Sequence, residues 1–202
     1  MRSKKKRNFL VIGGTGFIGY FVLKRILKLK HNATSLSISK PSKLRKLSKV
    51  KYLLGNIKNF NEINKLLKKK NFDYVINCGG YVEHIKKKEI YESHYKGSIN
   101  LYNVFRNKKI KLFIQIGSSS EYGDAKVPHK ENYICNPKGY YGKIKLKITN
   151  FFLIKSKKYN FPATIIRFYQ VYGPNQNFNR FIPQLIKSSI QKKTFITSHG
   201  NQ

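Results

Sequence analysis

The sequence is poor in acidic residues and cysteines, and it has no long apolar run. Aspartate and glutamate together number 8 against 42 lysines and arginines, which gives a formal net charge of +34. The two cysteines, Cys78 and Cys135, form no CxxC pair, which excludes a disulfide scaffold and a cysteine-rich zinc site. No apolar run approaches the ~18–20 residues that a membrane span requires. We therefore expect a cytoplasmic protein with reduced thiols, no metal site and no membrane association.

The positive charge by itself predicts non-specific attraction to polyanions at low salt. Lysine outnumbers arginine, however, whereas base readout and bidentate phosphate contacts favour arginine. The lysines are spread along the whole chain, and they accompany asparagine, isoleucine, tyrosine and phenylalanine, whose codons are also rich in A and T. We therefore expect no specific nucleic-acid partner. An anionic small molecule fits the charge equally well.

The 202 residues suffice for one domain or slightly more, and 40% of them are hydrophobic, enough for a core. Short β-branched or aromatic runs alternate with longer helical patterns, which is typical of βαβ units. The predicted strands are at residues 9–12, 34–39, 50–54, 74–78, 112–116, 164–168 and 194–197. The predicted helices are at residues 17–29, 60–67, 93–105, 141–155 and 181–190, with a short basic helix after Pro41. Strands this apolar indicate an α/β fold, a doubly wound parallel (Rossmann) sheet with helices on both faces.

A glycine-rich segment follows the first predicted strand and opens the first predicted helix. It reads Gly13-Gly14-Thr15-Gly16-Phe17-Ile18-Gly19. A dinucleotide pyrophosphate requires a tight turn, a bare backbone that it can approach and a helix N-terminus whose N–H groups face the anion. The spacing satisfies GxGxxG, and its place between a strand and a helix makes the match specific. We predict that these seven residues bind a dinucleotide.

The end of the second predicted strand indicates which nicotinamide dinucleotide is bound. An acidic residue there binds the ribose 2′-hydroxyl of NAD, and this sequence has none from Ser37 to Lys40. Ser39 and Lys40 are instead suited to the 2′-phosphate of NADP. We favour NADP, and NAD remains the alternative, in which Lys40 is one more solvated lysine of a lysine-rich chain.

Two further segments carry candidate catalytic groups. Ser118 lies in a serine cluster after the fifth predicted strand, at the carboxyl edge where open α/β sheets bind ligands. Tyr141 and Lys145 are one helical turn apart, so they share a helix face. A lysine ammonium beside a phenol stabilises the phenolate, so we expect it to lower the tyrosine pKa from its usual value of ~10. These groups are suited to moving a proton at an alcohol or ketone while a nicotinamide transfers hydride.

In this order, the segments resemble the extended short-chain dehydrogenase/reductase family, which contains nucleotide-sugar epimerases, dehydratases and reductases. The resemblance spans residues 9–202 and includes residues 167–174, which are similar to the family's Arg-x-x-Asn-x-Tyr-Gly-Pro. It implies that Ser118 orients the substrate, that Tyr141 is the acid/base, and that Lys145 tunes Tyr141 and binds the nicotinamide ribose. It further implies that Asn56 contacts the adenine. The implied substrate-binding residues are Ser118, Ser119, Ser120, Gln170, Asn179 and Arg180.

The family resemblance also predicts how the chain is organised. It implies an NAD(P)-binding domain at residues 1–170 and a substrate-binding lobe that begins at residues 171–202. The family sequence continues beyond a similar Gly-x-Gln, so we expect this lobe to be incomplete. The resemblance further implies a nucleotide-sugar substrate and a homodimer that pairs the helices near residues 93–105 and 141–155.

Departures from the family pattern bear on the reaction. Family dehydratases resemble Thr-Asp-Glu or Thr-Ser-Glu where this chain has Ser118-Ser119-Ser120, and Glu121 is displaced by one position, so we expect no dehydratase. The serine cluster and residues 169–174 most resemble 4-ketoreductases of the CDP-abequose synthase type, which serve surface polysaccharides such as lipopolysaccharide. We predict an NADP-dependent reductase of a nucleotide-linked 4-keto-6-deoxysugar. The alternatives are an NAD-dependent nucleotide-sugar 4-epimerase and a non-catalytic, truncated dinucleotide-binding remnant.

Overall fold

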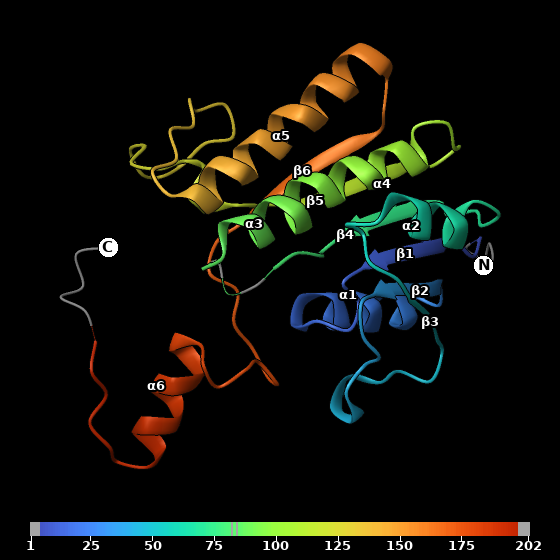
Figure 1. Cartoon of the computed structure of the whole chain (residues 1–202). Helices are drawn as coiled ribbons and strands as arrows, with labels where there is room; N and C mark the ends of the chain where they lie inside the picture. The colour runs from blue at the N-terminus through green and yellow to red at the C-terminus, as the bar shows by residue number, and fades with distance from the viewer. Residues whose placement is uncertain (1–4, 82, 84, 198–202) are drawn as a thin grey trace. The chain divides into compact units, whose positions relative to one another are not determined.

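The computed structural model of the chain describes residues 5–81, 83 and 85–197 (Figure 1). The backbone divides into two compact units, Met1–Tyr169 and Gln170–Gln202. We describe each unit separately. The assignment of one unit to the cofactor and the other to the substrate stays a prediction.

The first unit is built on one sheet of six parallel strands. The strands are β1 (Asn8–Ile12), β2 (Asn32–Ser37), β3 (Val50–Leu54), β4 (Tyr74–Asn77), β5 (Leu112–Ser118) and β6 (Ala163–Phe168). They lie in the order β3-β2-β1-β4-β5-β6, which is that of a doubly wound dinucleotide-binding sheet. The predicted fold class is therefore confirmed. Because the order reverses between β1 and β4, ligands are expected at the carboxyl ends of these two strands.

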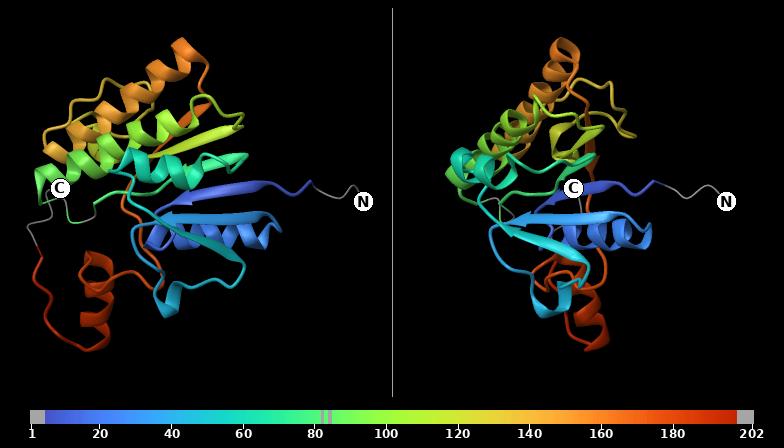
Figure 2. Two further views of the ribbon diagram at one scale, coloured as in Figure 1. Left: turned by 45° about the vertical axis from the view of Figure 1, so that its right-hand side comes forward. Right: turned by 90° about the vertical axis from the view of Figure 1, so that its right-hand side faces the viewer.

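Helices cover both faces of the sheet (Figure 2). The helices of the first unit are α1 (Phe17–Lys28), α2 (Phe60–Leu67), α3 (Lys87–Ile90), α4 (Gly97–Phe105) and α5 (Tyr140–Tyr159), with short 3-10 helices at Lys43–Arg45 and Ser119–Glu121 and a π-helical turn at Tyr91–Lys96. Helix α1 packs with Val11 on one face, and α2, α4 and α5 pack with Leu10 and Ile12 on the other. Successive side chains of β1 thus point to opposite faces of the sheet, as the two-residue period of a strand requires.

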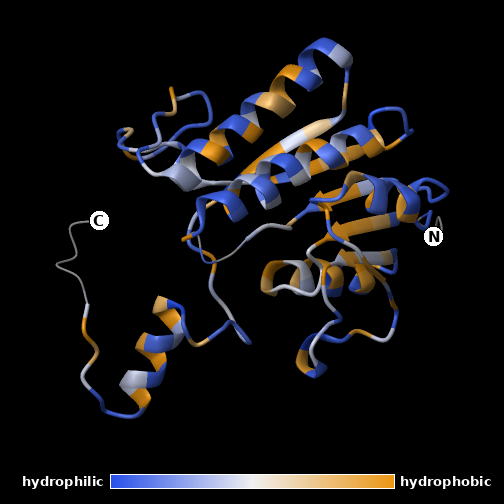
Figure 3. Ribbon diagram, viewed as in Figure 1, coloured by the Kyte–Doolittle hydropathy of each residue, from blue (hydrophilic) through white to orange (hydrophobic). Residues whose placement is uncertain are grey.

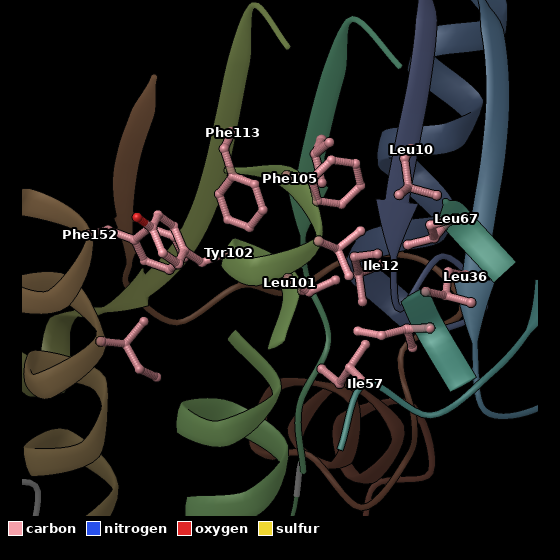
Figure 4. Close-up of a cluster of buried hydrophobic side chains, with 14 of the residues drawn as sticks. Leu10, Ile12, Leu36, Ile57, Leu67, Leu101, Tyr102, Phe105, Phe113 and Phe152 are labelled. Carbon is pink, nitrogen blue, oxygen red and sulfur yellow. The ribbon is translucent and has the colours of Figure 1, made fainter. Parts of the chain in front are cut away.

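The larger core cluster lies under α2, α4 and α5, and Figure 4 shows part of it. The rings of Phe113 on β5 and Phe152 on α5 stack with centroids 5.0 Å apart, and Phe105 on α4 packs beside Phe113 at 6.4 Å. All three side chains are fully buried. Each such burial stabilises the fold by about 1.5–3 kcal/mol. The aromatic packing fixes α4 and α5 on the sheet, and with them the groups at their N-terminal ends.

Several predicted elements have different limits in the structure, including α5, which runs over Tyr140–Tyr159 rather than over residues 141–155. Strand β2 begins at Asn32 and ends at Ser37, not at residues 34–39, because it pairs with β1 from Asn8 onward and turns outward at Ile38, which is 77% exposed. The helix predicted to begin at Ser93 begins at Lys87. Its first turn consists of exposed lysines and a glutamate, so it lacks the apolar periodicity on which the prediction depended.

The second unit contains helix α6 (Phe181–Ile190), with the predicted limits. Apolar residues recur along α6 with polar residues between them (Figure 3). Phe181 packs against Phe195 with ring centroids 5.6 Å apart. Residues 193–197 have no regular secondary structure, so the strand predicted at 194–197 is wrong: no strand of the described chain pairs with it. Within residues 5–197, apart from 82 and 84, no helix has the length and apolar character to cross a membrane.

Candidate active site

The glycine-rich turn connects β1 to α1, and the packing itself requires glycine at three positions. Gly13 has φ +72°, in the left-handed region that favours glycine. A Cβ on Gly14 would lie 2.5 Å from Oγ of Ser35, and a Cβ on Gly19 would lie 2.2 Å from the carbonyl oxygen of Gly13. These three glycines therefore let α1 pack directly against the end of β1.

Gly16 is different, because only one atom lies close to the position of a Cβ there. Its ideal Cβ would meet only the carbonyl oxygen of Gly13, at 3.2 Å. Gly16 is the N-cap of α1, which has no side-chain cap hydrogen bond and no acidic residue in its first turn. The turn thus presents bare backbone at a helix N-terminus, a cradle that a side chain would fill. These features fit a dinucleotide pyrophosphate.

The structure places Ser37, rather than Ser39 or Lys40, at the end of β2. The hydroxyl of Ser37 accepts a hydrogen bond from the backbone N–H of Thr15 at 3.3 Å, so it lies directly beside the glycine-rich turn. Ser39 and Lys40 follow in an exposed bend. Ser37 therefore has the position at which an acidic residue would bind the NAD ribose, and the sequence pattern missed it because the strand ends two residues early.

Asn56 follows β3 at the same edge of the sheet. Its Oδ1 accepts a hydrogen bond from the backbone N–H of Lys58 at 3.0 Å, and its carbonyl accepts one from Asn59 N–H at 2.9 Å. Asn56 thus shapes the turn that leads into α2. Its contact with the adenine stays a prediction.

Ser118 ends β5 and caps the 3-10 turn that follows. Its Oγ accepts a hydrogen bond from the N–H of Ser120 at 3.2 Å, and its own N–H donates to Oε1 of Glu121 at 2.8 Å. A Cβ on Gly142 would lie 2.5 Å from the carbonyl oxygen of Ser120, so α5 begins in direct contact with this turn. This close approach brings the hydroxyl of Tyr141 into a hydrogen bond with the side chain of Ser118.

Lys145 lies one turn further along α5, in the interior of the protein. It is 4% exposed, and its Nζ donates a hydrogen bond to the carbonyl oxygen of Ile116 on β5. The same Nζ lies 6.0 Å from the centre of the Tyr141 ring. The structure therefore brings Ser118, Tyr141 and Lys145 together at the carboxyl end of β5.

Burial dominates the ionisation of this group. Loss of hydration raises the pKa of Tyr141, which the hydrogen bond from Ser118 offsets in part and the Glu121 carboxylate reinforces. Burial lowers the pKa of Lys145 to about 8, against the opposing attraction of Glu121 and Cys78. The expected lowering of the Tyr141 pKa by Lys145 is thus not found, because the ammonium group faces the Ile116 carbonyl and desolvation outweighs the rest. Tyr141 is protonated at neutral pH and is suited to donate a proton.

The pKa of Lys145 predicts an alkaline gain in stability. Because it falls from 10.5 to about 8 on folding, the unfolded chain binds more protons between these two pH values, so the free energy of unfolding rises with pH there. The free energy of unfolding rises by about 3 kcal/mol in total. Below pH 8 the protonated, buried Lys145 destabilises the folded state by this full amount. Urea denaturation at pH 7 to 10.5 gives the free energy of unfolding of the wild type and of Lys145→Met. The change with pH in the difference between the two proteins measures this rise. A constant difference would contradict the buried ammonium.

Cys78 connects the glycine-rich turn with Lys145. Its N–H donates to the carbonyl of Ile12 at 3.1 Å, and a Cβ on Gly13 would lie 3.0 Å from the Cys78 carbonyl oxygen. Burial raises the pKa of the Cys78 thiol to about 12, and the Lys145 ammonium opposes that rise. Cys78 therefore adjoins both parts of the candidate site. Apart from its place at the end of a predicted strand, no sequence pattern marks Cys78 as part of the site.

Glu121, for which the sequence analysis expected no dehydratase role, is fully buried. Its Oε2 accepts hydrogen bonds from Thr149 Oγ1 at 2.8 Å and from Arg167 Nε at 2.9 Å, in addition to the Oε1 contact with Ser118. All its acceptor positions face β5, α5 and β6. It is therefore a structural carboxylate, which supports the expectation that it does not perform a dehydratase's acid–base chemistry.

The other predicted substrate residues lie in two places. Ser119 is half-buried and Ser120 exposed in the turn after β5. Gln170, Asn179 and Arg180 belong to the second unit, so their contacts with substrate stay predictions.

Two hollows, of about 540 and 270 Å³, lie at the amino ends of the first three strands and are lined in part by lysines. They are at the edge of the sheet opposite to the glycine-rich turn, so they do not adjoin the candidate site. Among the described residues, no group of three or more His, Cys, Asp or Glu side chains could hold a metal ion.

The sequence profile of the NAD dependent epimerase/dehydratase family matches residues 9–202. The chain belongs to this family. Among curated proteins it is 24% identical over 207 residues to a UDP-glucose 4-epimerase of Lactobacillus helveticus, covering 95% of this chain and 63% of that protein. It is 26% identical to a dTDP-D-glucose 4,6-dehydratase of Dictyostelium discoideum, covering 96% of this chain and 50% of that protein.

Solved structures show the same fold. The UDP-glucuronic acid 4-epimerase of Bacillus cereus, in complex with UDP-glucuronic acid and NAD, superposes with a TM-score of 0.84 at 24% identity, covering 96% of this chain and 67% of that one. A UDP-glucose 4-epimerase of Thermotoga maritima gives a TM-score of 0.87 at 20% identity, covering 96% and 66%. The present chain thus spans about two-thirds of these relatives or less.

Proposed function

We propose that the chain carries the cofactor-binding and proton-transfer part of a nucleotide-sugar 4-epimerase. The supporting observation is the hydrogen-bonded pair Ser118 and Tyr141, beside the buried Lys145, at the sheet edge where the glycine-rich turn begins α1. The names of the relatives favour this alternative over the 4-ketoreductase that the sequence pattern suggested. The sugar and the base stay open.

Each side chain has a role that follows from its surroundings. In the proposed reaction, the ionised form of Tyr141 takes the proton of the sugar 4-hydroxyl when it is oxidised, and the protonated form returns it when the 4-ketone is reduced, while Ser118 orients that oxygen; because burial raises the pKa of Tyr141, the first of these steps is the one that alkaline pH favours. Lys145 supplies positive charge below the phenol and, by the family resemblance, holds the nicotinamide ribose. A nicotinamide dinucleotide held at the glycine-rich turn, Gly13–Gly19, would supply the hydride acceptor and donor for C4.

A specific observation favours a reductase as the second candidate. No acid stands at Ser37, the end of β2, and the raised pKa of Tyr141 suits a proton donor to a ketone. The two candidates differ in their products. With UDP-glucose or UDP-glucuronic acid and NAD, an epimerase forms the 4-epimer, which chromatography detects, without net change in absorbance at 340 nm. A reductase consumes NADPH with a nucleotide-linked 4-keto-6-deoxysugar and forms no epimer. If neither product were formed, both proposals would be contradicted.

The choice between NAD and NADP is tested at Lys40. If Lys40 binds the 2′-phosphate, Lys40→Ala weakens NADP by about tenfold and leaves NAD unchanged, since the loss of one charge-assisted contact costs about 1.4 kcal/mol. Lys69→Ala, at an exposed lysine that follows α2, is the control for a general effect of charge. Isothermal titration at 150 mM salt measures both cofactors. Unchanged affinity for both cofactors would show that Lys40 is a solvated lysine, and equal weakening of NAD and NADP would show that it does not bind the 2′-phosphate.

Gly16 gives a sharp test of dinucleotide binding. Gly16→Ala should fold normally, because its Cβ meets only one atom at 3.2 Å, but it should bind NAD(P) at least about tenfold more weakly, because the methyl group occupies the pyrophosphate's approach. Gly19→Ala is the contrast, because its Cβ would lie 2.2 Å from backbone and should destabilise the fold itself. Thermal melting with and without cofactor separates the two effects. Undiminished binding by Gly16→Ala would place the dinucleotide elsewhere.

We also propose a homodimer that pairs α4 and α5. Helix α5 exposes apolar side chains, with Leu153 52% and Ile154 58% exposed, which supports an interface there. Sedimentation of the wild type and of Leu153→Lys tests it. A monomer at micromolar concentration would contradict the pairing.

A further inference from the structure

A widened helical turn lies beside the candidate site. Between α3 and α4 the backbone forms a π-helical turn, Tyr91–Lys96, and π-helical turns are frequent at functional sites. His94 lies in this turn and is only 7% exposed, although histidine is polar. The imidazole is therefore buried, and the groups that it contacts are the ones that it can hold in place.

The π-helical turn binds both the N–H and the carbonyl group of Tyr81. The N–H of Tyr81 donates to Oγ of Ser93 at 3.0 Å, and Nε2 of His94 lies 3.0 Å from the Tyr81 carbonyl oxygen. Because a carbonyl only accepts, Nε2 of His94 carries the hydrogen in this contact. Consecutive residues of the π-helical turn thus bind both main-chain groups of one residue in the segment that follows β4.

Gly80, immediately before Tyr81, packs directly against the imidazole. It has φ +149°, and a Cβ there would lie 2.0 Å from Cε1 and 2.3 Å from Nδ1 of His94. No other residue could keep this backbone while His94 keeps its position. The segment after β4 is therefore built around the imidazole ring.

The same imidazole contacts the ring of Tyr141. The two ring centres are 5.4 Å apart and the planes meet at 74°, an edge-to-face arrangement. Tyr141 also bonds to Ser118 through its hydroxyl, so the ring contact with His94 and the hydroxyl contact with Ser118 act at different points of one side chain. The two contacts therefore act together on the orientation of the phenol.

We propose that His94 is a positioning residue for Tyr141: it holds the phenol ring in the orientation that bonds to Ser118, and it ties that orientation to the backbone of Gly80 and Tyr81. This inference rests on the proposed function of Tyr141 as the proton-transfer group. A histidine that merely fills space would leave proton transfer unchanged when a side chain of similar volume replaced it.

The test compares His94→Phe with His94→Leu in the full chain. Both variants lose the bond to the Tyr81 carbonyl and both are apolar, but only phenylalanine keeps an aromatic edge toward Tyr141. We expect kcat to fall about thirtyfold for leucine and by about threefold or less for phenylalanine, because a misplacement near 1 Å of a catalytic group costs up to about a hundredfold. The dissociation constant for NAD(P) should be unchanged in both.

A second measurement needs no turnover, so it separates this inference from the proposed function. In protein labelled with 3-fluorotyrosine, the ¹⁹F resonance of Tyr141 is identified by its absence in Tyr141→Phe. His94→Leu should shift and broaden it, because the ring samples several orientations, and His94→Phe should leave it sharp. If the wild type were inactive but the two variants gave these ¹⁹F spectra, the proposed function would be overturned and the positioning of Tyr141 by His94 would stand. Equal resonances and equal kcat in the two variants would overturn the positioning role.

Discussion

Tyr141→Phe is expected to lower kcat for the proposed sugar conversion by about 10²–10⁴-fold, the usual contribution of a positioned acid or base. The loss has a simple cause. Phenylalanine keeps the ring that packs against His94 but removes the hydroxyl that bonds to Ser118 and moves the proton. Affinity for the dinucleotide should be nearly unchanged, because the glycine-rich turn that binds it is intact. Chromatographic product formation gives kcat, and titration gives the cofactor affinity.

Tyr140→Phe is the matched control for this prediction. Tyr140 is the first residue of α5, one position before Tyr141, and it is 37% exposed. Loss of its hydroxyl should change kcat by no more than about twofold. If both variants were equally active, or if both lost activity alike, proton transfer would have to be assigned to another group.

Glu121→Ala is expected to reduce the free energy of unfolding by about 3–5 kcal/mol, since removal of one partner leaves a buried charge uncompensated. Its carboxylate bonds to Ser118 N–H, Thr149 Oγ1 and Arg167 Nε, and thereby connects β5, α5 and β6. In a chain of this length the melting temperature should fall by about 10 °C. Urea denaturation and thermal melting at pH 7 measure both quantities.

Glu131→Ala controls for loss of an acidic residue in a chain with few of them. The side chain of Glu131 is exposed, so its removal should change the free energy of unfolding by less than about 0.5 kcal/mol. A loss for Glu121→Ala no larger than that of Glu131→Ala would show that the buried carboxylate contributes nothing to the fold. The prediction does not depend on any activity of the chain.

The reaction at C4 follows from the site only in part. The comparisons favour an epimerase, whereas the missing acid at the end of β2 and the raised pKa of Tyr141 suit reduction of a ketone. The same three side chains perform the proton transfer in both reactions. The two differ in whether the dinucleotide is retained between the oxidation and the reduction, which the product assay resolves.

The sequence alone determined the sheet, the glycine-rich turn and the spacing of Tyr141 and Lys145. These are local patterns, because alternation of strand and helix, glycines forced by close approach, and a separation of one helical turn all depend on near neighbours in the chain. The strand order β3-β2-β1-β4-β5-β6 comes from the structure, although parallel strands with helical crossovers have few ways to connect.

Only the tertiary structure decided what each side chain faces. Sequence could not show that β2 ends at Ser37, because strand limits depend on pairing with β1. The sequence analysis predicted that Lys145 lowers the pKa of Tyr141. In the structure burial raises that pKa, and the Lys145 ammonium donates a hydrogen bond to the carbonyl oxygen of Ile116. The contact of His94 with Tyr141 joins residues 47 positions apart. Such contacts and the desolvation that accompanies them arise from long-range packing, and no local pattern encodes them.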